Sequence, residues 1–163
     1  GFGANPKPIE QLELDEWRTF MDINLTSMFL ITRAVLPQMR ARGGGRIVNL
    51  ASVAGRSISE ISALHYSTAK AAVLGFTRKL AYEEGPNNIT VNSVAPGTVF
   101  TERVETRYRA LPQDEQDKRM DEIPLKRAAR PEEIAAAILF LASDDASYIT
   151  GAAIDVNGGR FMS

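Results

Sequence analysis

The chain has 163 residues, and its 19 lysines and arginines against 20 aspartates and glutamates leave a net charge of −1. A nearly neutral protein has no long-range field that favours nucleic acid, anionic lipid or a polyanionic substrate, so we expect a small-molecule partner, with no nucleic acid and no membrane. The sequence has no cysteine and one histidine, His65, which excludes disulfide scaffolds, thiol nucleophiles, cysteine-based zinc sites and multi-histidine metal sites.

The organisation predicted from the sequence is one domain over residues 1–163. A chain of this length buries roughly 70% of its unfolded surface, and no repeat, low-complexity segment or composition shift divides it. Its apolar runs are far shorter than the roughly 18 to 20 residues that cross a bilayer, which predicts a cytoplasmic location. Gly1 begins a stretch typical of a loop already under way, so we expect further residues before it in the native protein.

The first predicted element is helical. Asp15 is the predicted N-cap, and apolar residues then recur at helical spacing from Trp17 to Met39, which indicates one long helix or two abutting helices. Three glycines at positions 43–45 end this region. Residues 46–51 follow as a short β-branched run, typical of a parallel strand that is buried on both faces.

A second helix and a second strand come after a loop over residues 52–63. Apolar residues recur on one side of residues 66–84, and a Gly-Pro pair ends this predicted helix. Residues 88–94 then predict a strand, which ends at a Pro-Gly pair.

The remaining residues complete an alternating pattern. The charged stretch over residues 102–127 predicts a solvated helical insert, Pro131 opens a further helix, and residues 152–156 form the last predicted strand. Helices that alternate with strands predict an α/β protein with a parallel sheet. Three strands are half of a doubly wound, Rossmann-type sheet, so we expect the C-terminal half of such a fold.

Tyr66 and Lys70 are the first candidates for chemistry. They are four residues apart on a predicted helix, so their side chains lie on one face within about 6 Å. An ammonium at about 4 to 6 Å favours the phenolate of a tyrosine, whose unperturbed pKa is about 10. A surface tyrosine one turn before a lysine is common, however, so the pair alone carries little weight.

Ser52 and the segment Pro96, Gly97 and Thr98 strengthen this interpretation. Each follows a predicted strand of the sheet. In open α/β sheets, ligands bind in the crevice at the carboxyl ends of the strands. Two strand ends and one helix face are therefore expected to converge on one crevice.

Five segments, in this order and spacing, resemble the short-chain dehydrogenase/reductase family over nearly the whole chain. They are DINL (22–25), RIVNLASVAG (46–55), YSTAK (66–70), VNSVAPGTVFT (91–101) and DVNGG (155–159). The resemblance implies an oxidoreductase that transfers a hydride between a nicotinamide cofactor and a secondary alcohol or ketone.

The resemblance also implies roles for individual residues. Tyr66 is the expected general acid or base, and Ser52 is expected to hydrogen-bond the substrate oxygen. Lys70 is expected to hold the nicotinamide ribose and to lower the tyrosine pKa, and Asn24 to anchor a water that links Lys70 to solvent. Proton exchange by Tyr66 would accompany hydride transfer, with no covalent intermediate.

Further residues are implied in cofactor binding. Beside Tyr66 and Lys70, they follow the second strand and are Pro96, Gly97, Thr98, Val99 and Thr101, with Val99 acting through its backbone. The sequence does not distinguish NAD from NADP, because that choice rests on an acidic or basic residue at the end of a strand that it does not contain. The helical regions over residues 15–41 and 66–84 resemble family surfaces that form dimers and tetramers, so a homo-oligomer is expected.

One departure from the family narrows the expectation. The Gly-rich turn between a strand and a helix, which binds pyrophosphate through backbone N–H groups, has no counterpart in the sequence. We therefore expect this chain to be the C-terminal catalytic portion of a Rossmann-type domain and to be inactive by itself. The alternative is a truncated, non-catalytic relative that serves as an interaction or regulatory module.

Several candidate residues also have ordinary structural interpretations. Asn24 could cap the second of two helices, Ser52 could be a loop serine, and Thr101 could be the N-cap of a helix. A serine hydrolase that uses His65 is disfavoured, because no Gly-x-Ser-x-Gly turn is present.

The substrate pocket is expected to be shaped by residues 53–63 and by the insert after Thr101, which in family members often closes over substrate. Ile58, Ile61 and Leu64 would make this pocket moderately apolar if they point inward. Substrate identity does not follow from the sequence.

Overall fold

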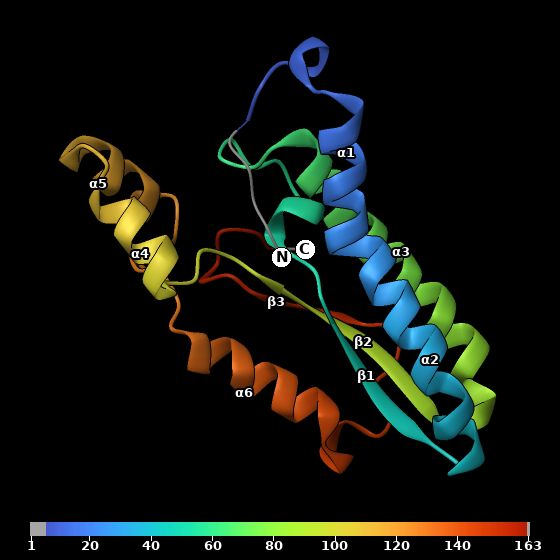
Figure 1. The fold of residues 1–163 in the computed structure, drawn as a ribbon. Helices are drawn as coiled ribbons and strands as arrows, with labels where there is room; N and C mark the ends of the chain where they lie inside the picture. The colour runs from blue at the N-terminus through green and yellow to red at the C-terminus, as the bar shows by residue number, and fades with distance from the viewer. Residues whose placement is uncertain (1–5, 163) are drawn as a thin grey trace.

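A computed structural model describes residues 6–162, which form a parallel sheet with helices on both faces (Figure 1). The sheet has the order β1-β2-β3. The strands are β1 (Gly45–Leu50), β2 (Ile89–Pro96) and β3 (Ala153–Val156), and the helices are α1 (Leu14–Met21), α2 (Ser27–Ala41), α3 (Leu64–Glu84), α4 (Glu102–Arg109), α5 (Gln113–Asp121) and α6 (Pro131–Ala142). The α/β class, the parallel sheet and its three strands are as predicted, with boundaries shifted by one or two residues.

β2 is the central strand and holds the two layers together. It pairs in parallel with β1, where Leu50 lies opposite Val94, and with β3, where Val156 lies opposite Pro96. Nearly every residue of β2 is buried, because helices cover both of its faces. The carboxyl ends of all three strands consequently lie at one edge of the sheet.

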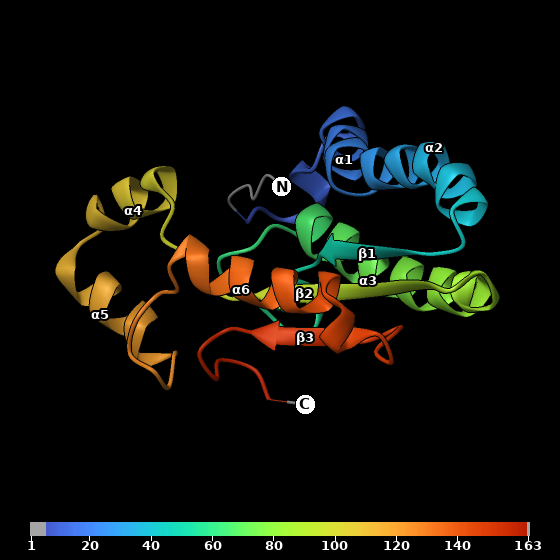
Figure 2. The same cartoon turned by 90° about the horizontal axis from the view of Figure 1, so that it is seen from below.

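Apolar side chains fix the helices against the sheet. α2 and α3 cover one face, and α6 covers the other (Figures 1 and 2). On the first face, Leu36 and Leu80 pack with Ile89 and Val91. On the second face, a cluster around Val94 contacts α6 and the following turn, through Ile134, Leu141 and Ala146. The side chains of alternate β2 residues thus pack on opposite faces of the sheet, as expected for a parallel strand that helices cover on both faces.

The prediction that β1 is buried on both faces is wrong for the residues described. Asn49 is buried, but most of the strand is half-buried and Leu50 is 50% exposed. β1 is the last strand on its side of this sheet. The apolar run forms the predicted parallel strand, but the burial of a strand also depends on whether another strand lies beside it.

The first helical region is continuous and has an unusual centre. α1 passes into the π-helical segment η2 (Asp22–Thr26) and then into α2 without leaving helical backbone angles. The first helix begins at Leu14, with Glu13 at the N-cap position, so the prediction of Asp15 as N-cap is wrong. A single π-helical turn inside an α-helix is frequent at functional sites.

The predicted solvated insert is confirmed as two short helices, α4 and α5, which project from the carboxyl edge of the sheet (Figures 1 and 2). None of their residues is buried. No helix within residues 6–162 is long and apolar enough to span a membrane.

A buried carboxylate joins the ends of α2 and α3. Glu84 is 1% exposed and accepts from the Arg40 Nε at 2.9 Å, with a second Arg40 nitrogen at the other carboxylate oxygen. Asn87 Nδ2 donates to Glu84 at 3.0 Å. The Arg40 guanidinium holds the pKa of Glu84 below its usual value against the opposing effect of burial. A bidentate pair of this kind fixes geometry as well as charge.

We expect Glu84→Gln to lower the Tm by roughly 2 to 6 °C, the range for losing a partner in a buried polar network in a domain of this size. Because the folded pKa is depressed, the stabilisation is present above the unfolded pKa and is lost as pH falls through the folded pKa. The deficit should therefore shrink on acidification, as measured by thermal unfolding between pH 7 and pH 3.

Glu83→Gln is the matched control, because Glu83 is exposed and forms a surface pair with Lys79 at 3.0 Å. Equal effects of the two substitutions at pH 7, or a deficit for Glu84→Gln that grows in acid, would contradict the role of the buried pair.

Candidate active site

The predicted residues Ser52, Tyr66 and Lys70 lie together at the carboxyl end of β1. Ser52 follows the strand by two residues, and Tyr66 and Lys70 lie in the first two turns of α3. The short 3₁₀ turn η3 (Val53–Gly55) lies against α3. The loop that leaves β1 therefore returns along the helix that carries the tyrosine.

Lys70 is a buried ammonium tied to the strand end. It is 6% exposed, and its Nζ donates to the carbonyl oxygen of Leu50 at 2.8 Å. The same Nζ lies 5.8 Å from the centroid of the Tyr66 ring. Burial lowers the pKa of Lys70, because an ammonium loses hydration when it leaves water.

The Tyr66 phenol differs from the expectation based on Lys70. Burial raises its pKa above 10, and a hydrogen bond with Ser52 opposes this shift in part. Proximity to an ammonium predicted the opposite direction. Burial dominates here, and the Lys70 ammonium is directed to the Leu50 carbonyl. Tyr66 is therefore a protonated phenol at neutral pH.

Ser52 has one structural role beside its contact with the tyrosine. Its backbone is extended, and its Oγ accepts from the backbone N–H of Ala54 at 3.2 Å, which caps η3. The residue is 9% exposed. This cap orders the turn, and the hydroxyl hydrogen remains available to a second acceptor, since a hydroxyl donates as well as accepts.

Gly55 allows η3 to approach α3. A Cβ at this position would lie 2.5 Å from the carbonyl carbon of Lys70 and 2.6 Å from the backbone nitrogen of Ala71. Both are backbone atoms of a helix, which cannot move aside as the end of a flexible side chain can. The distance between the Ser52 turn and the Lys70 turn thus depends on the absence of a side chain at Gly55.

Asn24 lies in the π-helical segment and is 5% exposed. Its Nδ2 donates to the carbonyl of Phe20 at 3.0 Å, and its Oδ1 is buried without a hydrogen-bond partner within residues 6–162. The capping interpretation is wrong, because the residue before α2 has helical backbone angles and no side-chain cap. An unpaired buried amide oxygen costs free energy unless it finds a donor, so it is a suitable acceptor for a water.

The segment after β2 contains the predicted cofactor residues. Pro96 ends the strand, and Gly97 lies against β3, since a Cβ there would be 2.9 Å from the Cα of Asn157. Val99 forms an isolated parallel bridge with Ala129.

Thr98 and Thr101 extend this segment toward the insert. The carbonyl of Thr98 accepts from the backbone of Ala129 at 2.9 Å. Thr101 is the N-cap of α4, as the structural interpretation predicted, and its Oγ1 accepts from Val104 at 3.4 Å. Thr98 also lines a cavity of about 80 Å³ beside Asn157.

An ion pair that the sequence did not predict links the Ser52 turn to β3. Arg56 Nε lies 2.9 Å from Asp155 Oδ1, and its guanidinium lies over the Phe161 ring at 5.1 Å. Burial raises the pKa of Asp155 despite the neighbouring guanidinium. The available signal was an aspartate inside an otherwise apolar strand, which favours a charged partner.

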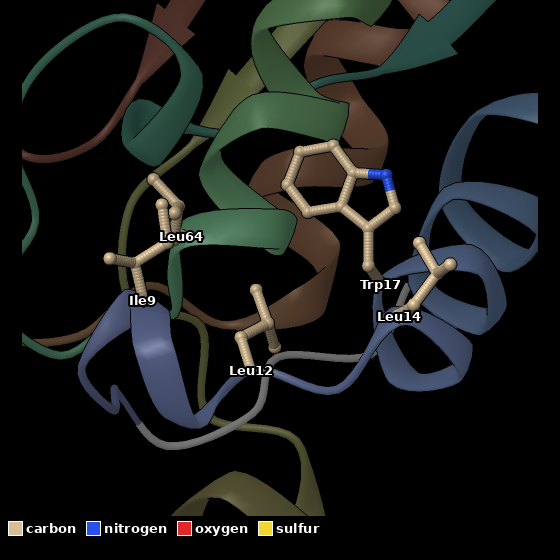
Figure 3. Close-up of a pocket in the computed structure, with 5 residues that line it drawn as sticks. All are labelled: Ile9, Leu12, Leu14, Trp17 and Leu64. Atoms are coloured by element: carbon tan, nitrogen blue, oxygen red, sulfur yellow. The ribbon is translucent and has the colours of Figure 1, made fainter.

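Ile58, Ile61 and Leu64, which would make the pocket moderately apolar if they point inward, are not buried within residues 6–162. Ile58 is 93% exposed, Ile61 is 41% exposed and Leu64 is 45% exposed. Leu64 instead faces the junction of α1 and α3, where a cavity of about 260 Å³ is lined by Ile9, Leu12, Leu14, Trp17 and Leu64 (Figure 3). Leu64 and Tyr66, two residues apart at the start of α3, thus lie on different surfaces: Leu64 at the junction with α1 and Tyr66 beside Ser52.

Comparisons with known proteins find similarity over nearly the whole chain. A family model described as enoyl-(acyl carrier protein) reductase matches residues 1–160. An acetoacetyl-CoA reductase of Allochromatium vinosum is 42% identical over 156 residues, which cover 96% of this chain and 61% of the relative. A 3-oxoacyl-[acyl-carrier-protein] reductase FabG of Pseudomonas aeruginosa is 44% identical over 149 residues, 91% of this chain and 58% of the relative.

Solved structures are also similar over nearly the whole chain. A 3-oxoacyl-[acyl-carrier protein] reductase of Brucella melitensis has a TM-score of 0.90 at 38% identity, over 99% of this chain and 61% of the other. A second such structure, with bound NAD, has a TM-score of 0.85 at 38% identity, over 99% and 60%. An oxidoreductase of the short-chain dehydrogenase/reductase family from Burkholderia thailandensis has a TM-score of 0.89 at 36% identity, over 99% and 61%. The chain spans about three fifths of the length of these relatives.

The close approach at Gly55 gives a prediction about stability. Gly55→Ala forces η3 away from α3 and should cost about 1 to 3 kcal/mol of unfolding free energy, as overpacking typically does. Gly75→Ala is the matched control on α3, because a Cβ there meets nothing within 4 Å. It should stabilise by about 0.5 to 1 kcal/mol. Denaturant unfolding followed by circular dichroism measures both, and a neutral Gly55→Ala would refute the close contact.

Proposed function

The chain belongs to the short-chain dehydrogenase/reductase family, and we propose that it carries the proton-transfer site of a nicotinamide-dependent ketoreductase. The observation that supports this most is the convergence of Ser52, Tyr66 and Lys70 at the carboxyl end of β1, with Lys70 bonded to the strand end and facing the Tyr66 ring. Ser52 also caps η3 and Lys70 also ties α3 to the strand end, and both side chains keep donor hydrogens for a ligand.

The residues present fit a nicotinamide nucleotide. The buried Lys70 ammonium has three donor hydrogens and uses one on Leu50. In the proposal, Lys70 and Tyr66 bind the nicotinamide ribose, and Pro96, Gly97, Thr98, Val99 and Thr101 lie along the carboxamide and phosphates.

The bound nucleotide would supply or accept the hydride at the carbinol carbon. In the reducing direction, Tyr66 gives its phenolic proton to the substrate oxygen, while Ser52 donates a hydrogen bond to the same oxygen. Burial raises the pKa of Tyr66 and so disfavours loss of its proton, whereas the hydrogen bond with Ser52 lowers the pKa and would assist the transfer.

Asn24 completes the proposed proton path. Its unpaired Oδ1 is an acceptor for a water, and such a water would connect Lys70 to solvent after Tyr66 has lost its proton. The π-helical turn that carries Asn24 contacts α3. The proposed site thus combines Asn24 of the π-helical segment, Ser52 after β1, and Tyr66 and Lys70 of α3.

The proposed substrate class is a 3-oxoacyl thioester. The relatives reported above include an acetoacetyl-CoA reductase and a 3-oxoacyl-[acyl-carrier-protein] reductase, at 42% and 44% identity. NAD and NADP are not distinguished. A homo-oligomer is also proposed, because apolar residues on α2 are exposed, including Ile31 at 66% and Leu30 at 45%.

Tyr66→Phe tests the proposed chemistry in the protein encoded by the native gene. We expect acetoacetyl-CoA reduction, followed by NADH or NADPH absorbance, to fall by about 10²-fold or more, the usual contribution of a general acid. Tyr82→Phe is the control, since Tyr82 lies on the same helix and is 81% exposed. A wild type that is inactive with 3-oxoacyl thioesters, alcohols and sugars would instead favour an interaction or regulatory module.

A second prediction concerns the 163 residues alone, which lack the Gly-rich pyrophosphate turn. We propose that they form the C-terminal catalytic portion of one Rossmann-type domain and bind nucleotide too weakly to measure. Titration of the isolated chain with NADH and NADPH, followed by nicotinamide fluorescence, should show no saturation up to millimolar concentration. Tight binding would refute the proposal that these residues hold the catalytic portion of the domain without its main nucleotide-binding part.

A further inference from the structure

His65 is a buried titratable group that the proposed chemistry does not use. It immediately precedes Tyr66 in the first turn of α3, and it is 0% exposed. Its imidazole stacks on the Phe20 ring, with centroids 3.8 Å apart and planes 9° apart. Its Nε2 lies 3.2 Å from Glu16 Oε1. A carboxylate only accepts hydrogen bonds, so Nε2 is the protonated nitrogen in this contact.

Phe20 connects His65 to Asn24. While its ring lies under the imidazole, its backbone carbonyl accepts from Asn24 Nδ2 at 3.0 Å. One residue of α1 therefore contacts both the neighbour of Tyr66 and the side chain of Asn24. Phe20 therefore links Asn24 to His65, the residue that precedes Tyr66 in the chain.

Glu16 anchors the same contact from one turn earlier on α1. It lies four residues before Phe20 and therefore on the same helix face. It forms a second ion pair with Lys7, which leads into α1 from the preceding segment. The lysine and the imidazole both lower the pKa of Glu16, in that order. The acceptor of His65 is thus held in place and remains a carboxylate.

The first turn of α3 has no side-chain cap. The N-cap residue is Ala63, whose side chain offers no acceptor for the free backbone N–H groups. At the junction of α1 and α3, Leu14 is 58% exposed and Leu64 is 45% exposed, and both line the cavity in Figure 3. While η3 packs against α3 on the Ser52 side, the contacts of His65 hold the same turn on the side that faces α1.

We propose that His65 is a positioning residue, whose imidazole between Glu16 and Phe20 sets the place of Tyr66 relative to Asn24. The role in turnover rests on the proposed function, but the placement of the α3 first turn does not. His65 does not touch the reacting atoms. It acts by fixing the helix turn that carries the phenol, and small displacements of a catalytic group are costly.

Amide hydrogen exchange, read by mass spectrometry on the native-gene protein, tests the placement without any activity. In His65→Ala we expect exchange to rise at least tenfold over residues 64–69 and 22–26, with residues 76–84 of the same helix unchanged. Thr19→Ala is the control, because Thr19 is exposed on α1 and bonds its own helix. Unchanged exchange at residues 64–69, or a uniform rise along α3, would overturn the proposal.

Conservative variants separate the stacking of His65 on Phe20 from its hydrogen bond to Glu16. They also keep the proposal testable if His65→Ala does not fold. His65→Phe keeps a ring for stacking on Phe20, His65→Gln keeps a donor for Glu16, and Glu16→Gln keeps a neutral acceptor. We expect all three to show local exchange between wild type and His65→Ala. Local exchange equal to wild type in both His65→Phe and His65→Gln would show that neither contact positions the turn.

The turnover readout distinguishes this proposal from the proposed function. If the wild type reduces acetoacetyl-CoA, His65→Ala should lower kcat by about 10- to 100-fold while the KM for nucleotide changes less than threefold, and His65→Gln should recover part of kcat. A local rise in exchange with kcat unchanged would overturn the positioning role. If the wild type is inactive but exchange rises locally, the ketoreductase proposal fails and the placement of Tyr66 by His65 stands.

Discussion

The arrangement of the candidate site depends on how closely the turn after β1 approaches α3. Gly55 lies where any side chain would meet the backbone of Lys70, and the Lys70 ammonium returns to the Leu50 carbonyl at 2.8 Å. These two contacts, one steric and one polar, lock strand end, turn and helix into a single unit. Ser52 and Tyr66 come together because they lie on either side of that unit, and α1 and α2 then bring Asn24 to it through the π-helical segment.

Burial is the main electrostatic influence inside this unit. It raises the pKa of Tyr66 and lowers the pKa of Lys70, so each shift opposes the charged form of its group. The raised pKa disfavours loss of the Tyr66 proton, and the hydrogen bond with Ser52 opposes that effect.

The elements were predictable because their signals are local. Helical periodicity, a glycine stop and the residues after each strand placed Ser52, Tyr66 and Lys70 at one edge of the sheet. The π-helical turn at Asn24 was not predictable, because a shift in backbone pairing leaves little trace in composition. The pairing of Arg56 with Asp155, the packing of His65 and the exposure of Ile58 depend on contacts between distant segments, which periodicity does not report.

The most direct measurement is isotope transfer by the protein encoded by the native gene. Reduction of acetoacetyl-CoA with NADH or NADPH that carries deuterium at the nicotinamide C4 should place one deuterium on the carbinol carbon of the product, as detected by mass spectrometry. Label should come from one face of the ring only, because a fixed site presents one face to the substrate. Two results would contradict the proposed hydride-transfer site. One is a product that carries no deuterium, whichever face of the nicotinamide is labelled, and the other is the absence of product with both NADH and NADPH.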